Sequence, residues 1–371
     1  MRSNTVQRLM AAAVSIALLA GLAACGNNAV TQNGAEAAPA VPGLSGSFAG
    51  AGASSQQAAV EAWVSGFQRN NPDTTISYNP SGSGAGVITF LTGATAWAGS
   101  DKPLSDDDIA QSKSICAEGT SAFDVPVYIA PIAIAYKLKG FDSEHIKMSA
   151  ATIAKVFDGK ITAWNDPAIA AENPGLSLPN TPITVVHRSD KSGTTLNFVN
   201  YLAAAAPEAW PYEPSENWPN DVGQGAKGTS GVVSTIDMAD GTIGYADYSQ
   251  AGSMGTVAVK VGDSYTEISA DAGSKAIADS TIKHVEGKGR VVVDVNYTTQ
   301  QRGAYPIVLL SYNVVCPVYR NADTGRFAKA WMRYVTSEAG QQTSRQATGS
   351  SPLPQDLSAR VAESVDAMRD N

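Results

Sequence analysis

The sequence predicts an α/β protein made of two lobes. Helical and strand-like apolar patterns alternate along most of the chain, which is typical of the α/β class. Two strand patterns, over residues 124–136 and 306–319, are long and continuously apolar, as expected for strands buried on both faces. One lies near the middle of the chain and the other near its end. We therefore expect two crossings between the lobes, after which the C-terminal part returns to the first lobe.

Shorter elements are expected wherever the apolar spacing is clear. Val60, Trp63, Val64 and Phe67 recur at the spacing of an amphipathic helix over residues 56–70. Further strands are expected at residues 74–80, 94–100, 182–188 and 242–248, and further helices from residue 87 and over residues 326–337 and 355–367.

The composition excludes some classes of partner. The chain has 371 residues, enough for about two to three domains, and its 43% apolar and 16% charged residues fit a soluble globular protein. Its formal net charge is -8 and it contains no basic run, so we expect no nucleic-acid partner.

The N-terminus has the pattern of an export signal. Arg2 and Arg8 form a positive n-region before an apolar run over residues 9–20 that is too short to span a bilayer comfortably. Small residues and then Cys25 follow, as in the lipobox of bacterial lipoproteins. We predict a signal peptide over residues 1–24.

Cleavage before Cys25 would leave that cysteine to carry the acyl chains of a lipoprotein. Two or three chains would anchor the protein stably. Residues 25–43 are mostly small or polar, with Pro and Gly, and we expect them to form a flexible tether. The alternative is a plain secretory signal followed by an unmodified cysteine.

Cys116 and Cys316 are the other two cysteines. An export signal implies an oxidising compartment, where such a pair is a candidate disulfide. The alternative is two buried free thiols. A disulfide would place a loop of the first half of the chain beside a strand near the C-terminus.

Three short stretches share one design that suits an anion. Residues 50–55, 81–86 and 189–195 each combine Gly with Ser or Thr between a strand-like and a helix-like segment. A helix N-terminus has unpaired N–H groups and a partial positive charge, Gly allows close approach, and hydroxyls donate hydrogen bonds. Together they predict an anion site. The alternative for each stretch is an ordinary helix cap.

Charged residues accompany these stretches. Arg188 ends an expected strand, where ligand sites of open α/β sheets lie, and can bind a tetrahedral oxyanion through two donors. Asp190 could orient it, although the two could instead form a solvated surface pair. Asp101 near an anion makes sense if the ligand carries a proton, as phosphate does and sulfate does not. Alternatively, Asp101 caps the helix suggested by residues 103–112.

Other catalytic and cofactor patterns are weak. Residues 223–228 match G-x-G-x-x-G, but no clear strand precedes them, as a dinucleotide site requires. His145, His187 and His284 lie far apart, so we expect no metal and no cofactor. Residues 191–193 resemble the K-S-G element of penicillin-recognising enzymes, but the accompanying S-x-x-K and S-x-N elements follow it instead of preceding it.

Seven motifs in order make the chain resemble a known family. They are GAGASSQ, YNPSGSGAGV, AGSDKPLSDDD, GKITAWNDPAIAAENPGLSLP, VVHRSDKSGTTLNFVNYL, GTIGYADY and YPIVLLSYNVV. With these motifs, nearly all of residues 46–360 resembles the substrate-binding lipoprotein of the bacterial phosphate-specific ABC transporter, a periplasmic phosphate-binding protein.

The resemblance implies a periplasmic-binding-protein-like fold. Each lobe would be a mainly parallel sheet flanked by helices, and two hinge strands would join the lobes. Lobe I would comprise residues 44–134 and 307–371, and lobe II residues 135–306. The hinges would fall near Ala133 to Tyr136 and Tyr305 to Leu309.

The resemblance also implies which residues contact the ligand. Asp101 would accept the phosphate hydrogen, and Asp190 would hold Arg188. The implied phosphate contacts are Ser54, Ser55 through its backbone, Ser83, Asp101, Arg188, Ser192, Gly193 and Thr194. The family's first loop usually reads Thr-Phe where this chain has Ser54-Ser55, so the hydroxyl donor is kept and the apolar cover is not.

We therefore expect an extracytoplasmic receptor, lipid-anchored through Cys25 to the outer face of the cell membrane. It would bind inorganic phosphate between its lobes and deliver it to the transmembrane permease subunits of an ABC importer. We expect a monomer that is not an enzyme. The alternatives are a receptor for another tetrahedral oxyanion such as sulfate, and a secreted phosphatase-like hydrolase that uses Ser192 as nucleophile and needs metals.

Overall fold

The computed structural model describes residues 37–141 and 145–369. The predicted signal peptide, Cys25 and the first part of the predicted tether lie outside the described residues. No helix in the described part of the chain is both long and apolar enough to cross a membrane.

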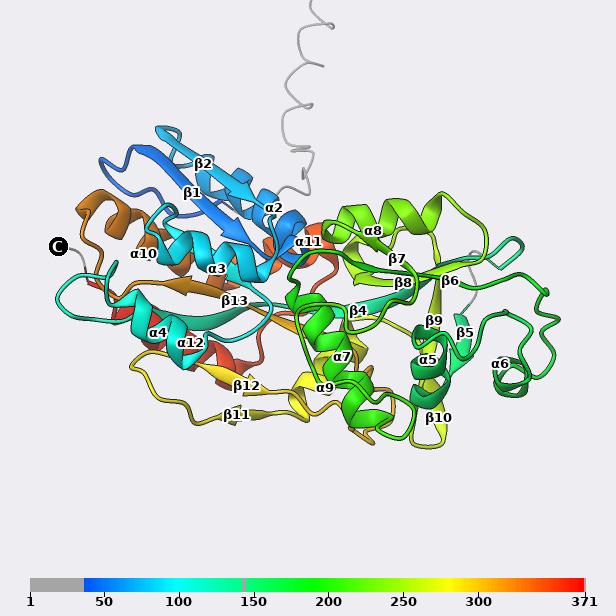
Figure 1. Ribbon diagram of the computed structural model, residues 1–371. Helices are drawn as coiled ribbons and strands as arrows, with labels where there is room; N and C mark the ends of the chain where they lie inside the picture. Colours follow the sequence, from blue (N-terminus) through cyan, green and yellow to red (C-terminus); the bar gives the residue numbers. More distant parts are fainter. Residues whose placement is uncertain (1–36, 142–144, 370–371) are drawn as a thin grey trace, which may run out of the picture. The chain divides into compact units, whose positions relative to one another are not determined.

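One mixed sheet runs through the protein (Figure 1). In its first half β2, β1 and β3 are parallel, and in its second half β8, β6 and β7 are parallel. Two strands, β13 and β4, lie between the halves and run antiparallel to their neighbours. The strand order is β2 (Thr74–Asn79), β1 (Gly46–Gly52), β3 (Trp97–Ser100), β13 (Val308–Val315), β4 (Phe123–Lys137), β8 (Thr242–Asp247), β6 (Thr184–Arg188) and β7 (Gln224–Ala226).

Five shorter or peripheral strands complete the described sheets. β9 pairs with the end of β4 and with both β5 and β10, whereas β11 and β12 form a separate two-stranded sheet. Their bounds are β5 (His145–Met148), β9 (Gly255–Val261), β10 (Ser264–Thr266), β11 (Thr281–Lys283) and β12 (Val292–Asp294).

β4 passes from one half of the sheet to the other. It pairs with β13 from Phe123 to Pro131 and with β8 from Ile132 to Lys137. All of β13 and all of β4 except its last residue are buried, as the continuous apolar patterns predicted. The two-lobe α/β fold is therefore confirmed. The change of partner comes immediately before the segment Ala133 to Tyr136, where we expected a hinge.

Helices cover the sheet, and several begin where a strand of the first or second half ends. They are η1 (Ser54–Gln56), α2 (Gln57–Gln68), α3 (Ser83–Leu91), α4 (Asp106–Ser112), α5 (Ala150–Phe157), α6 (Pro167–Glu172), α7 (Gly193–Ala205), α8 (Gly228–Asp237), η2 (Tyr248–Gln250), α9 (Ala270–Ala278), α10 (Ala322–Thr336), α11 (Glu338–Thr348) and α12 (Gln355–Asp366).

Two helices near the C-terminus differ from the prediction. α10 begins at Ala322, four residues before the expected start, because the Asn321 side chain accepts a hydrogen bond from the Thr324 N–H (2.8 Å) and caps it. α11 was not expected, since its sequence is polar and lacks a helical apolar spacing. The Ser337 hydroxyl caps α11 by accepting from the Gly340 N–H (3.1 Å).

Aromatic side chains hold helices on each half of the sheet. In the first half, Trp97 of β3 packs against Trp331 of α10 with ring centroids 5.2 Å apart. In the second half, Phe198 of α7 stacks on Tyr245 of β8 with centroids 4.7 Å apart. Such buried aromatic pairs contribute more than the area they bury, so they fix the positions from which the helices present their ends.

Cys116 and Cys316 form a disulfide, which confirms the predicted pairing. The two residues are separated by 200 positions, and their Cα atoms lie 5.4 Å apart. The bond joins the loop after α4 to the end of β13, so it ties the first half of the chain to one of the two central strands.

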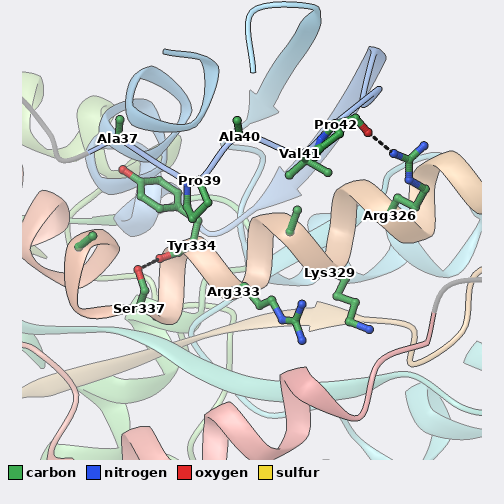
Figure 2. Close-up of a pocket in the computed structure, with 12 residues that line it drawn as sticks. Ala37, Pro39, Ala40, Val41, Pro42, Arg326, Lys329, Arg333, Tyr334 and Ser337 are labelled. Carbon is green, nitrogen blue, oxygen red and sulfur yellow. Dashed lines mark hydrogen bonds between the residues drawn. The ribbon is translucent and has the colours of Figure 1, made fainter. Parts of the chain in front are cut away.

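Residues 37–43 fall within the predicted tether, but they are packed onto the folded protein. Ala38 is fully buried, and its N–H donates to the Gly66 carbonyl of α2 (3.0 Å). Arg326 of α10 donates to the Pro42 carbonyl (2.7 Å). Figure 2 shows this segment alongside α10, where both line a cavity of about 560 Å³. The expectation of a flexible chain up to residue 43 was therefore wrong for these residues, because α2 and α10 offer them hydrogen bonds and apolar cover.

Candidate functional site

Four helix N-termini meet between the two halves of the sheet. Ser54 precedes α2, Ser83 opens α3, Gly193 opens α7 and Thr229 lies in the first turn of α8. The Ser54 and Thr229 hydroxyls are 2.9 Å apart, and the Thr229 N–H donates to Ser54 Oγ (3.1 Å). The Gly193 N–H donates to Ser83 Oγ (3.3 Å). Four partial positive charges and several N–H groups therefore face one small region, which suits an anion.

Two glycines permit this close approach. A Cβ atom at Gly82, which has a φ of +95°, would lie 2.7 Å from Asp190 Oδ2. A Cβ atom at Gly193 would lie 2.6 Å from the Asp101 Cβ. Any larger residue at either position would push the halves apart, so packing requires glycine at these two positions of the predicted anion-binding stretches.

Arg188 supplies a buried positive charge. It ends β6, is 3% exposed, and donates from Nε to Asp190 Oδ1 (2.7 Å) and from Nη2 to Asp190 Oδ2 (2.5 Å). The Gly228 N–H also donates to Asp190 (3.0 Å). Burial raises the pKa of the Asp190 carboxyl, but the hydrogen bonds and charge of Arg188 outweigh it and hold that pKa below its usual value. The alternative of a solvated surface pair is wrong, because Arg188 is buried and Asp190 accepts two hydrogen bonds from its guanidinium.

Asp101 follows β3 and is 3% exposed. It accepts hydrogen bonds from Ser55 Oγ (2.7 Å to Oδ1 and 2.8 Å to Oδ2), Ser311 Oγ (2.5 Å) and Thr194 Oγ1 (3.0 Å). Burial raises the pKa of the Asp101 carboxyl, although these three donors and the charge of Arg188 oppose the rise.

Asp101 is not a helix cap. The cap of α4 is Ser105, which forms a capping box with Asp108. The carboxylate of Asp101 instead faces Ser55 and Thr194, in the region where the helix N-termini meet.

The structure brings the implied contact residues together, but some of their hydroxyl groups already form hydrogen bonds within the protein. The Ser192 hydroxyl accepts from the Thr195 N–H (3.1 Å) and so caps α7. The Ser55 hydroxyl faces Asp101, so the departure from the family's apolar residue adds a donor to this carboxylate. Lys191 is exposed, as expected.

Further contacts join the two halves around the region. Lys102 Nζ lies 2.7 Å from Glu216 Oε2, and the Asn197 side chain donates to the Asp101 carbonyl (2.7 Å). Gln250 donates to the Ser54 carbonyl (3.2 Å). The structure therefore has the halves closed on each other.

Four residues of the site were missed from the sequence: Gln56, Asn197, Thr229 and Ser311. Gly228-Thr229 has the same design as the other three stretches, but β7 before it has only three residues and leaves no strand pattern. Ser311 is one of two small polar residues, with Asn313, in an otherwise apolar buried strand, and that was its only signal.

A cavity of about 510 Å³ reaches Asp101 from one side. Lys102 and Lys283 are among its lining residues, together with Asn197 and Tyr297. Among residues 37–141 and 145–369, no three or more His, Cys, Asp or Glu side chains are grouped so that they could hold a metal ion.

The fold and the site define a class of two-lobe solute-binding proteins, and the family comparison agrees. The sequence model of the PBP superfamily domain matches residues 37–339. Phosphate-binding protein PstS 2 of Mycobacterium tuberculosis is 39% identical over 324 residues, which cover 85% of this chain and 86% of that protein. Phosphate-binding protein PstS 3 of Mycobacterium leprae is 35% identical over 359 residues, or 95% of each chain. The chain belongs to the PstS family of phosphate-binding proteins within the PBP superfamily.

Solved structures support the same fold. The phosphate-bound periplasmic phosphate-binding protein PfluDING matches with a TM-score of 0.68 at 20% identity, covering 86% of this chain and 93% of its own. A human phosphate-binding apolipoprotein matches with a TM-score of 0.66 at 19% identity, covering 85% and 93%.

Proposed function

We propose that this protein is an extracytoplasmic receptor that binds inorganic phosphate between its lobes and delivers it to an ABC importer. One observation carries the proposal: a buried arginine and four helix N-termini surround the same region as a buried carboxylate. Relatives that are named phosphate-binding proteins, and a neighbour solved with phosphate bound, support this choice of anion.

Phosphate would be held by one cation and many neutral donors. Arg188 would contribute guanidinium N–H donors other than the two, one on Nε and one on Nη2, that face Asp190. Hydroxyl and backbone donors would come from Ser54, Ser55, Ser83, Ser192, Gly193 and Thr194. Fixed dipoles in a site that excludes water stabilise an anion without a large net charge, so the overall charge of -8 does not oppose binding.

Asp101 would select phosphate. An ionised carboxylate only accepts hydrogen bonds, and phosphate near neutral pH carries a hydrogen to donate. Sulfate has none and would place an unpaired negative charge against Asp101. This makes a receptor for sulfate less consistent with the site than a receptor for phosphate.

Lobe I, over residues 44–134 and 307–371, and lobe II, over residues 135–306, would move about β4 and β13. The contacts of Lys102 with Glu216 and of Ser54 with Thr229 would form as the lobes close. The closed form would then dock on the permease subunits in the membrane.

A hydrolase fits the site poorly. The Ser192 hydroxyl caps α7 by accepting from a backbone N–H, and no histidine is among its hydrogen-bond partners in the described part of the chain. We propose a monomeric receptor that is not an enzyme, with acylated Cys25 as its anchor on the outer face of the membrane.

Calorimetry with phosphate and with sulfate at pH 7 tests the proposal. We expect tight binding of one phosphate per chain and much weaker binding of sulfate. Equal or tighter sulfate binding, or no phosphate binding, would overturn it. Steady turnover of a chromogenic phosphate ester would favour the hydrolase instead.

A further inference from the structure

A chain of buried side chains runs from Gln56 to Asp101 through Ser311. Ser311 lies on β13, one of the two central strands, and all three side chains are buried. Gln56 Nε2 lies 2.6 Å from Ser311 Oγ, and Ser311 Oγ lies 2.5 Å from Asp101 Oδ1.

The direction of each hydrogen bond in this chain follows from chemistry. Gln56 Nε2 also lies 3.1 Å from the Tyr312 carbonyl, which can only accept, so the atom facing it must be the amide nitrogen. The second hydrogen of that nitrogen then points to Ser311 Oγ. Ser311 has one hydroxyl hydrogen, and it is free to point only toward Asp101. Gln56 therefore makes Ser311 a donor to the carboxylate.

Strands β13 and β3 hold these side chains in place. On β13, Tyr312 pairs with Ser100 of the antiparallel β3, so Ser311 comes beside Asp101, the residue after Ser100. On the other side of β13, the register with β4 shifts between Ser311 and Tyr312. On β3, a Cβ atom at Gly99 would lie 2.9 Å from Gln56 Oε1, so the absence of a side chain there leaves room for the Gln56 carboxamide.

The donors favour the charged form of Asp101. Ser311 and Ser55 both donate to Oδ1, and Ser55 and Thr194 both reach Oδ2, so an added proton on either oxygen would displace a donor. Burial has the largest influence on the pKa of Asp101 and raises it. Among the interactions that lower this pKa, the hydrogen bond from Ser311 has the largest effect.

We propose that Gln56 and Ser311 are positioning residues that keep Asp101 an ionised acceptor and thereby set the discrimination between phosphate and oxyanions that carry no proton. Ser55 acts on the same carboxylate, at the position where the family it resembles has an apolar residue. The inference rests on the proposed function and adds specificity residues that do not themselves touch the ligand.

The test compares the unaltered protein with Ser311→Ala. Losing a hydrogen bond to a charged group should raise the apparent pKa of Asp101, and ¹³C NMR of the aspartate carboxyls would measure the change. A protonated Asp101 can donate to sulfate. Calorimetry at pH 5.5 to 8 should therefore give a sulfate-to-phosphate affinity ratio that rises about 10- to 100-fold near the lower end of this range.

Two further variants separate positioning from simple packing. Ser311→Thr keeps the hydroxyl and should restore most of the selectivity. Ser350→Ala removes a buried hydroxyl that pairs with Ser344 and should leave both the pKa of Asp101 and the selectivity unchanged. If Ser311→Ala does not fold, Gln56→Met should give a smaller change in the same direction, since Ser311 then loses its fixed orientation.

The outcomes distinguish this inference from the proposed function. A folded Ser311→Ala protein that binds phosphate with unaltered pH dependence and selectivity would overturn the inference alone. So would an unchanged Gln56→Met protein if only that variant folds. Absence of phosphate binding by the unaltered protein would overturn the proposed function and this inference with it.

Discussion

Asp247 is a buried carboxyl that titrates near neutral pH. It ends β8, is fully buried, and accepts hydrogen bonds from Tyr128 (3.1 Å to Oδ2) and from the Ser249 N–H (2.9 Å to Oδ1). Burial raises its pKa from 3.8 to about 7. Between these values the native state binds more protons than the unfolded chain, so stability falls as pH rises from about 4 to about 7 and is level above.

We predict that Asp247→Asn removes this pH dependence. The pKa difference of about three units corresponds to at most about 4 kcal/mol of unfolding free energy, at 1.36 kcal/mol per unit. Asn can keep the bonds from Ser249 to Oδ1 and donate from its amide to the Tyr128 hydroxyl. The variant should therefore gain stability at pH 8 and differ little from the unaltered protein at pH 4.

Urea unfolding followed by tryptophan fluorescence at pH 4 to 8.5 measures the effect. Asp263→Asn, which removes an exposed carboxylate, is the matched control and should leave the pH profile unchanged. If the Asp247→Asn protein is destabilised equally at every pH, the prediction is wrong, because the loss of stability would then come from lost hydrogen bonds and not from a buried charge.

Four other predictions concern the site and the disulfide. Asp101→Asn should raise the sulfate-to-phosphate affinity ratio about 10- to 100-fold at pH 7, measured by calorimetry. Arg188→Lys should weaken phosphate binding about 10- to 100-fold, because lysine cannot donate to Asp190 and the ligand in fixed directions. Thr229→Val should weaken it about 5- to 10-fold by removing a hydroxyl contact that holds the closed form. Replacing Cys116 and Cys316 by Ser should lower the unfolding free energy by about 2 to 4 kcal/mol in chemical denaturation.

Each of these has a result that contradicts it. An Asp101→Asn protein that still rejects sulfate would remove Asp101 from the selection of the ligand. Unchanged phosphate affinity in Arg188→Lys would mean that the anion lies elsewhere. Unchanged affinity in Thr229→Val would mean that the contact between Thr229 and Ser54 is absent when the protein binds phosphate. A reducing agent that leaves the unaltered protein as stable as before would argue against a disulfide that contributes to stability.

Local sequence patterns predicted those site residues that lie close together in the chain, next to a recognisable strand or helix start. Arg188 and Asp190 stand two residues apart after a clear strand pattern, and Gly193 opens a helix that follows at once. The long apolar patterns predicted β4 and β13 because burial on both faces leaves a continuous apolar run. Helix starts with Gly and hydroxyl residues then predicted where the N–H donors lie.

Other parts of the site and the fold depend on contacts between segments that are distant in the chain. A single sequence gives no local pattern that predicts such contacts. Ser311 reaches Asp101 because β13 pairs with β3 so that Tyr312 lies opposite Ser100, and Thr229 reaches Ser54 because the two halves meet. α11 is polar, so only its cap marked it. Residues 37–43 looked like a tether from composition alone, yet α2 and α10 supply partners for them.

We propose that phosphate is bound where the helix N-termini, Arg188 and Asp101 meet. A high-resolution crystal structure of the protein grown with phosphate would locate the ligand. We predict one phosphate within hydrogen-bond distance of Arg188, Ser83 and Thr194, with a protonated oxygen facing Asp101. Phosphate bound at another place, or no phosphate at this site at saturating concentration, would show that this region is not the binding site.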